Sequence, residues 1–126
     1  MEKPHVLIVE DNKINALVLK KAIQSVCQPT HVTDDNQAFA EIEKKPYELI
    51  LMDINLGGKS LDGEAIMKTL REDPKYRDLK IFAVTSYAMP GDKERFLNAG
   101  FDQYFTKPIN KGAILDGVKS VVEATA

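Results

Sequence analysis

The chain has 126 residues, a common size for a single domain, and a formal net charge of -2. Hydrophobic residues make up 44% and charged residues 29%, which gives no electrostatic reason to expect nucleic acid or a membrane as a partner. The single cysteine excludes an internal disulfide, and no stretch is long enough for a membrane span or a signal peptide. We therefore expect one cytoplasmic domain over residues 1–126.

The first half of the chain alternates apolar runs with helical patterns. Residues 6–9 predict a buried strand, and a helix follows that has Asn12 as its cap and ends at Gln28-Pro29. A weak, polar strand at residues 30–33 is typical of a sheet edge, and a short helix opens at Asp34. The first helix carries Ile14, Leu17, Val18, Ala22 and Val26 at helical spacing, and the second turns Ala38, Phe39 and Ile42 inward.

The stretch from Glu48 to Asp53 is the centre of the prediction. Its four apolar residues lie between Pro46 and Gly57-Gly58 and indicate a fully buried strand of a parallel sheet, although periodicity alone also allows a buried helix. Asp53 closes this strand. In open α/β sheets, ligands bind outside the carboxyl ends of the strands, so we place the chemistry of the chain at Asp53.

The second half repeats the alternation. After a loop at residues 54–62 we expect a helix that ends at Asp73-Pro74, a strand at residues 81–84, and a helix from Pro90-Gly91-Asp92 to Gly100. The last strand covers residues 103–105, and a final helix starts from an Asn110 cap. The helix that ends at Asp73-Pro74 is predicted to bury Ile66, Met67 and Leu70. The final helix is predicted to bury Ile114, Leu115, Val118, Val121 and Val122.

Five strands alternating with five helices predict an α/β fold, namely a doubly wound, five-stranded parallel sheet with helices on both faces. The strand order 2-1-3-4-5 is the small doubly wound solution, and it makes the first and third strands neighbours. Glu10, Asp11 and Asp53 then meet at one edge of the sheet. Thr85 and Lys107 reach the same edge from the ends of the next two strands.

Three clustered carboxylates predict a cation site. Two carboxylates ~4 Å apart repel by about 4 kcal/mol at an effective dielectric constant of ~20. Mg²⁺ is the natural counterion, because it takes one or two carboxylates together with water and phosphate oxygens, and Lys107 offsets one further charge. A metal, a nucleophilic Asp53, a lysine and a hydroxyl suit phosphoryl transfer, with an aspartyl phosphate as the product.

These residues resemble the receiver domain of two-component response regulators, and the resemblance covers nearly the whole chain. The matching segments are Val6 to Asn12, Leu49 to Asp53, Ala83 to Thr85, Met89 to Asp92 and Ala99 to Ile109. The resemblance implies the flavodoxin-like receiver fold. It also implies a signalling domain that phosphorylates and dephosphorylates itself rather than a turnover enzyme.

The resemblance implies a role for each site residue. Asp53 would be the phosphoacceptor, Asp11 a direct Mg²⁺ ligand, Glu10 an outer-shell or second acidic ligand, and the backbone carbonyl of Asn55 a further ligand. Lys107 would pair with the phosphoryl group.

Two further residues would form the switch. Thr85 would move its hydroxyl onto a phosphoryl oxygen, and Tyr104 would rotate inward behind it. This movement would change the surface made by the fourth helix, fifth strand and fifth helix. The Lys107-Pro108 bond is expected to be cis, as in the family.

The loop after Asp53 departs from the family pattern. Receivers usually have a proline four residues after the phosphoacceptor and a shorter path to the Asp-Gly that opens the third helix. Here Gly57-Gly58-Lys59-Ser60 intervenes before Asp62-Gly63. A longer loop beside the site would affect phosphoryl lifetime or partner choice.

The implied partners are a histidine kinase or a histidine phosphotransfer protein as phosphodonor, and a downstream protein that binds the switched surface. Because no output domain follows Ala126, we expect either a response through another protein or a receiver from a longer hybrid kinase. One alternative is a phosphatase of the haloacid dehalogenase type, whose second aspartate is replaced here by Asn55. Another is an interaction module that adopts the fold without phosphorylation.

Overall fold

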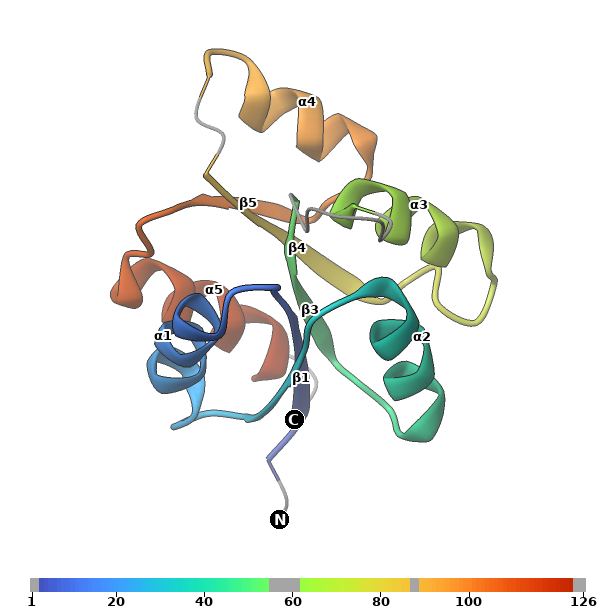
Figure 1. The fold of residues 1–126 in the computed structure, drawn as a ribbon, viewed down its shortest axis with the longest axis horizontal. Coiled ribbons are helices and arrows are strands. Elements are labelled where there is room, and N and C mark those ends of the chain that lie inside the picture. Colours follow the sequence, from blue (N-terminus) through green and yellow to red (C-terminus); the bar gives the residue numbers. More distant parts are fainter. Residues whose placement is uncertain (1–2, 55–61, 87–88, 124–126) are drawn as a thin grey trace.

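The computed structural model describes residues 3–54, 62–86 and 89–123, which form five strands and five helices (Figure 1). The strands are β1 (His5–Val9), β2 (Gln28–Val32), β3 (Leu49–Asp53), β4 (Lys80–Thr85) and β5 (Gln103–Thr106). The helices are α1 (Lys13–Ile23), α2 (Asp35–Lys44), α3 (Gly63–Glu72), α4 (Asp92–Ala99) and α5 (Lys111–Val122).

The strands form one parallel sheet in the order β2-β1-β3-β4-β5, which confirms the predicted topology. All five residues of the central strand β3 are buried. β2 lies at the edge, as its polar sequence predicts, and it accommodates Pro29 there because an edge strand needs fewer backbone donors. The order brings the carboxyl ends of β1 and β3 side by side.

The sheet separates two apolar clusters, because successive side chains of a strand point to opposite faces. On one face, β1 and β3 residues such as Leu7 and Ile50 pack with α2, α3 and Phe96 of α4. On the other face, residues such as Ile8 and Leu51 pack with α1 and α5. Figure 1 shows the same division, with α1 and α5 together on one side of the sheet.

Polar caps start most of the helices. Asn12 accepts hydrogen bonds from two N–H groups of α1, and Asn110 accepts one from α5. Asp34 and Asp62 cap α2 and α3 in the same way. α4 ends at Gly100, whose φ of 136° few other residues adopt. These caps confirm the predicted helix starts.

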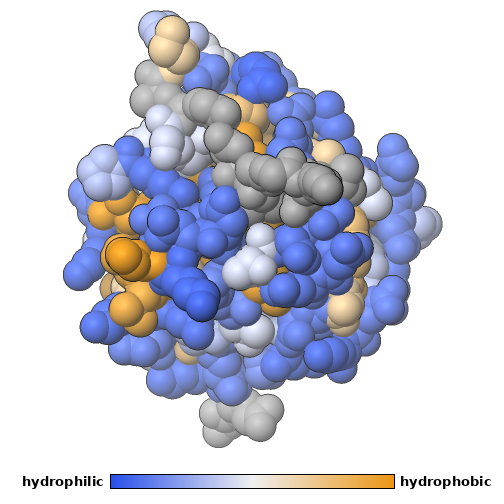
Figure 2. Space-filling model, in the orientation of Figure 1, coloured by the Kyte–Doolittle hydropathy of each residue, from blue (hydrophilic) through white to orange (hydrophobic). Residues whose placement is uncertain are grey.

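The prediction for α1 was wrong in two respects. The helix ends at Ile23, before the predicted Gln28-Pro29, because β2 already begins at Gln28. Its buried residues are Ala16, Leu19 and Ile23, whereas Ile14 and Leu17 are 73% and 50% exposed. The helix carries more apolar residues than one face can bury, so spacing alone could not select the stripe. Figure 2 shows the resulting apolar patch over α1 on an otherwise mostly hydrophilic face.

Arg71, near the end of α3, binds the two segments that lead into β4 and β5. Its guanidinium donates to the carbonyl oxygens of Arg77, Leu79 and Gly100 and to the carboxylate of Asp102. Asp102 also accepts the backbone N–H of Ile81, at the start of β4. Arg71 therefore fixes α3 to the beginnings of β4 and β5.

Within the part of the chain that the structure describes, no helix has the length and apolar character needed to cross a bilayer.

Candidate functional site

Asp53 lies at the carboxyl end of β3, where the sheet holds its backbone firmly. It pairs with Val84 of β4, and the N–H of the following residue, Ile54, donates to the Val84 carbonyl at 3.3 Å. Gly63, the first residue of α3, packs directly against the Asp53 carbonyl, since a Cβ on Gly63 would lie 2.1 Å from that oxygen. The side chain of Asp53 is buried, and the residue is only 4% exposed.

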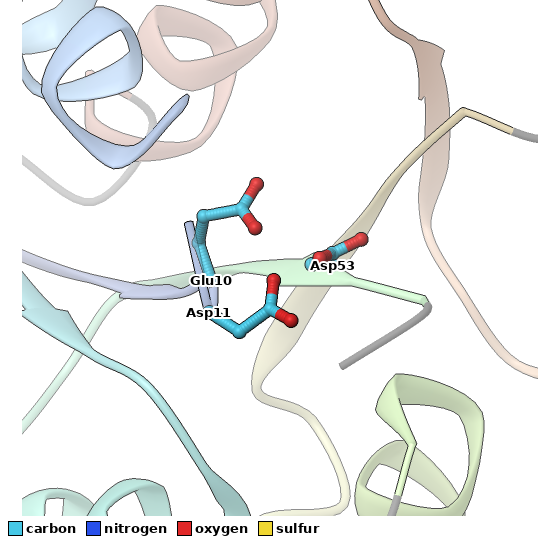
Figure 3. A group of neighbouring side chains, drawn as sticks. All are labelled: Glu10, Asp11 and Asp53. Atoms are coloured by element: carbon cyan, nitrogen blue, oxygen red, sulfur yellow. The ribbon is translucent and has the colours of Figure 1, made fainter. Parts of the chain in front are cut away.

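Glu10 and Asp11 follow β1 and approach Asp53 from the neighbouring strand. One carboxylate oxygen from each of the three residues lies within 4.8 Å of the other two. Glu10 is 1% exposed, whereas Asp11 is exposed to solvent. Figure 3 shows the three carboxylates around a common space, with Glu10 and Asp11 on one side and Asp53 on the other. The predicted convergence of these residues is confirmed.

Lys107 supplies a positive charge to this cluster from the end of β5. Its Nζ donates to Glu10 Oε1 at 2.6 Å and lies 3.5 Å from Asp53 Oδ1. The Lys107-Pro108 peptide bond is cis, as expected. Three carboxylates thus face one ammonium group, which leaves an excess of negative charge for a cation to balance.

The acidic neighbours Glu10 and Asp11 differ in their affinity for a proton. Burial alone would raise the pKa of Glu10. Hydrogen bonding to Asp53 and Lys107, the charge of Lys107 and the Asn12 N–H outweigh burial and lower this pKa below 4.5. The pKa of Asp11 is raised above 3.8 by partial burial and then by the neighbouring Glu10 carboxylate. A bound cation would favour the ionised form of Asp11 by attraction.

Thr85 and Tyr104 occupy the predicted positions on β4 and β5. Thr85 ends β4, is 1% exposed, and accepts the Lys107 N–H on its backbone oxygen at 2.8 Å. Tyr104 pairs with Ala83 and stacks on Phe96 of α4, with ring centroids 5.9 Å apart. Burial and then the charge of Asp92 raise the pKa of the Tyr104 phenol. The tyrosine therefore joins β5 to α4.

The cluster lines a cavity of about 210 Å³. Cavities that take organic ligands usually have ~300–1,000 Å³, so this one suits an ion, waters and one small anionic group. Besides the predicted residues, Asn12, Asn15 and Ser86 line it. Sequence reasoning did not place these three at the site, although all are close in the chain to a strand end. Asn55 and Gly57-Gly58-Lys59-Ser60, which the prediction includes, lie outside the described residues.

Known proteins resemble this chain in both sequence and fold. Residues 6–119 match the family described as response regulator receiver domain. The polar-differentiation response regulator DivK of Brucella ovis is 33% identical over 116 residues, which cover 91% of this chain and 93% of that protein.

Solved structures share the fold. The Francisella response regulator 1452 receiver domain superposes with a TM-score of 0.86 at 24% identity, covering 98% of this chain and 100% of that one. A sensor protein from Polaromonas sp. JS666 gives a TM-score of 0.84 at 26% identity, covering 98% of each chain.

Proposed function

The chain belongs to the response regulator receiver domain family of two-component signalling, and from this premise we propose that Asp53 accepts the phosphoryl group. One observation supports the assignment: Asp53 ends the central strand of the sheet, and the carboxylates of Glu10 and Asp11 and the ammonium group of Lys107 lie next to it. An aspartate oxygen is a competent nucleophile when its surroundings neutralise the incoming phosphoryl charge.

Receiver domains generally bind Mg²⁺ at an acidic pocket, and the donor set of this chain fits that ion. Carboxylate oxygens are the hard ligands that Mg²⁺ prefers, and the exposed Asp11 leaves one side of the cluster open to solvent. We assign Asp11 and Asp53 as direct ligands, Glu10 as an outer or second acidic ligand, and the Asn55 carbonyl as a further ligand. When bound, Mg²⁺ would neutralise phosphoryl oxygens and the excess charge of the carboxylates.

The transfer step is a displacement at phosphorus. A carboxylate oxygen of Asp53 forms the new P–O bond while the P–N bond to a donor phosphohistidine breaks, and the bonding pair returns to the imidazole. Lys107, 3.5 Å from Asp53 Oδ1, lies within reach of the transferred phosphoryl oxygens and pairs with them. Hydrolysis of the acyl phosphate by water restores Asp53. The chain thus acts as a switch rather than as a turnover enzyme.

The output of this switch runs through β4 and β5. We propose that the Thr85 hydroxyl bonds a phosphoryl oxygen and that Tyr104 moves inward behind it, as the resemblance implies. The contact between Tyr104 and Phe96 supports this route, since a shift of the tyrosine ring must repack α4. The surface of α4, β5 and α5 would then change for a downstream protein.

Two-component receivers interact with kinases or phosphotransfer proteins, and we propose a histidine kinase or a histidine phosphotransfer protein as donor, acting in the cytoplasm. The phosphatase alternative is not favoured, because the matching family consists of receivers and the cavity is small for an organic phosphate ester. The intact acidic cluster disfavours an unphosphorylated interaction module.

The proposal is tested by intact mass after incubation with acetyl phosphate, with and without Mg²⁺. We expect the wild type to gain one phosphoryl group only when Mg²⁺ is present, and Asp53→Asn to gain none. Asp34→Asn is the matched control, because it removes a carboxylate outside the site and asparagine still caps α2. Phosphorylation of Asp53→Asn at the wild-type level would refute the assignment.

A further inference from the structure

The side chain of His31, on the edge strand β2, contacts the backbone of Glu10 in the acidic site. The imidazole Nε2 lies 2.6 Å from the Glu10 carbonyl oxygen. A carbonyl oxygen only accepts hydrogen bonds, so this geometry requires a proton on Nε2 and a bond donated by the ring. At the same time, the Glu10 N–H donates to the Val32 carbonyl at 3.0 Å. The end of β2 therefore holds both backbone groups of Glu10, one residue beyond the last residue of β1.

The side chain of Glu10 is held just as completely. Its Oε1 accepts from Lys107 at 2.6 Å, and its Oε2 accepts the Asn12 N–H at 3.2 Å. In three of these four bonds the partner of Glu10 is a backbone group or Lys107, whereas in the fourth it is the His31 ring. His31 is the contribution of one side chain from β2, and nothing in the sequence pattern indicated it.

The hydrogen bond from His31 has a consequence for Asp11. The peptide group is planar, so a fixed Glu10 carbonyl also fixes the Asp11 nitrogen and the direction in which the chain continues. Asp11 is the exposed member of the cluster, and its carboxylate depends on that direction to reach the space shared with Glu10 and Asp53.

We propose that His31 is a positioning residue for the acidic cluster: its ring orients the Glu10–Asp11 peptide so that the Asp11 carboxylate faces Asp53. This inference rests on the proposed function, since it assumes that the cluster binds Mg²⁺. Groups that hydrogen-bond to metal ligands typically change metal affinity by ~10–100-fold when they are removed. Because His31 acts through a backbone carbonyl, we expect a loss at the lower end, about tenfold.

The experiment is a titration of the protein with MgCl₂ in the absence of any phosphodonor. Calorimetry measures the affinity for Mg²⁺, and the NMR signals of the backbone amides report the position of Asp11. Mg²⁺ prefers oxygen ligands, so a change in affinity on removing His31 would not report the loss of a direct ligand. His31→Ala removes the donor, and His31→Gln keeps an N–H donor at a similar reach. Thr33→Ala is the matched control, because the Thr33 hydroxyl bonds Gln37 rather than Glu10.

We expect His31→Ala to bind Mg²⁺ about tenfold more weakly, His31→Gln to recover most of the affinity, and Thr33→Ala to match the wild type. The amide signal of Asp11 in the metal-free protein should shift in His31→Ala and return toward its wild-type position in His31→Gln. A scalar coupling across the bond between His31 ¹⁵Nε2 and the Glu10 carbonyl carbon provides a direct readout in the wild type. It also serves as the test if His31→Ala does not fold.

Wild-type Mg²⁺ affinity in His31→Ala would overturn the role of His31 and leave the proposed function intact. Equal weakening in His31→Ala, His31→Gln and Thr33→Ala would also overturn it, because the effect would then be a general loosening of β2. A wild-type protein that neither binds Mg²⁺ nor accepts a phosphoryl group would overturn the proposed function itself.

Discussion

Gly63→Ala should damage both stability and phosphorylation, because α3 begins in contact with the backbone of Asp53. The added Cβ would lie 2.1 Å from the Asp53 carbonyl oxygen, about 0.9 Å inside the 3.0 Å limit that Cβ contacts essentially never cross. A backbone oxygen cannot rotate away, so α3 or the end of β3 must move. Overpacking costs about 1–3 kcal/mol, and removing a helical glycine returns at most ~1 kcal/mol. Because a contact at 2.1 Å calls for the upper end of the overpacking cost, we expect a net loss of about 2 kcal/mol.

The same displacement moves the nucleophile. A shift of ~1 Å in a reacting group can lower a rate by about 100-fold, so phosphorylation of Asp53 should slow by at least tenfold. Stability is measured by urea unfolding, and phosphorylation by the time course of the mass increase with acetyl phosphate. Gly112→Ala is the matched control on α5, where the new Cβ meets its nearest atom at 3.5 Å. It should leave phosphorylation unchanged and stabilise the protein by roughly 0.5 kcal/mol.

Gly63→Ala with the stability and phosphorylation rate of Gly112→Ala would refute this reasoning. It would mean that the end of β3 tolerates displacement, and that the close packing of α3 does not set the position of Asp53.

Three further predictions concern groups away from the cavity. Arg71→Met should destabilise the fold by about 2 kcal/mol in urea unfolding, because it strips a charged donor from several carbonyl oxygens; Arg71→Lys should recover little, since it lacks the planar fork. Burial raises the pKa of Cys27 to about 11, so intact mass should show alkylation only after unfolding. Burial, partly opposed by Thr30 and reinforced by Glu41, raises the pKa of Tyr47 from 10.0 to about 12. The native state keeps this proton longer, so the contribution of Tyr47 to stability is complete below pH 10 and is lost as the pH rises toward 12. Tyr47→Phe should lack this alkaline decline, and the ultraviolet titration of that variant should lack the last tyrosine step of the wild type.

The features that sequence predicted well are those with a local physical cause. β3 was recognisable because a strand buried on both faces needs a continuous apolar run, and Asp53 stood out as the charge that ends it. The helix starts at Asn12 and Asn110 followed from the need of the first N–H groups for acceptors. Once the strand order was fixed, the meeting of Glu10, Asp11 and Asp53 required no further information.

The features that sequence missed depend on contacts between distant segments. Helical spacing described α1 correctly as amphipathic, but the face that packs is chosen by α5 and β1, and Ile14 and Leu17 were left outside. The close approach of Gly63 to Asp53 and the bond from His31 to Glu10 are of the same kind. The Asp62-Gly63 pattern marked the start of the helix but not this contact, and His31 belongs to no pattern along the chain, so only three-dimensional placement indicates these roles.

The division of the core by the sheet gives β5 a particular place in the energetics of the molecule. Most substitutions on opposite faces touch no common neighbour, so their effects on the free energy of unfolding should add within about 0.5 kcal/mol in a double-mutant cycle. On β5, however, Tyr104 packs into the cluster with α4, and the next residue, Phe105, packs into the cluster with α5. At this edge strand, the two apolar clusters therefore lie beneath the same stretch of surface. A protein that binds α4 and α5 together would have an affinity that depends on the packing of both clusters.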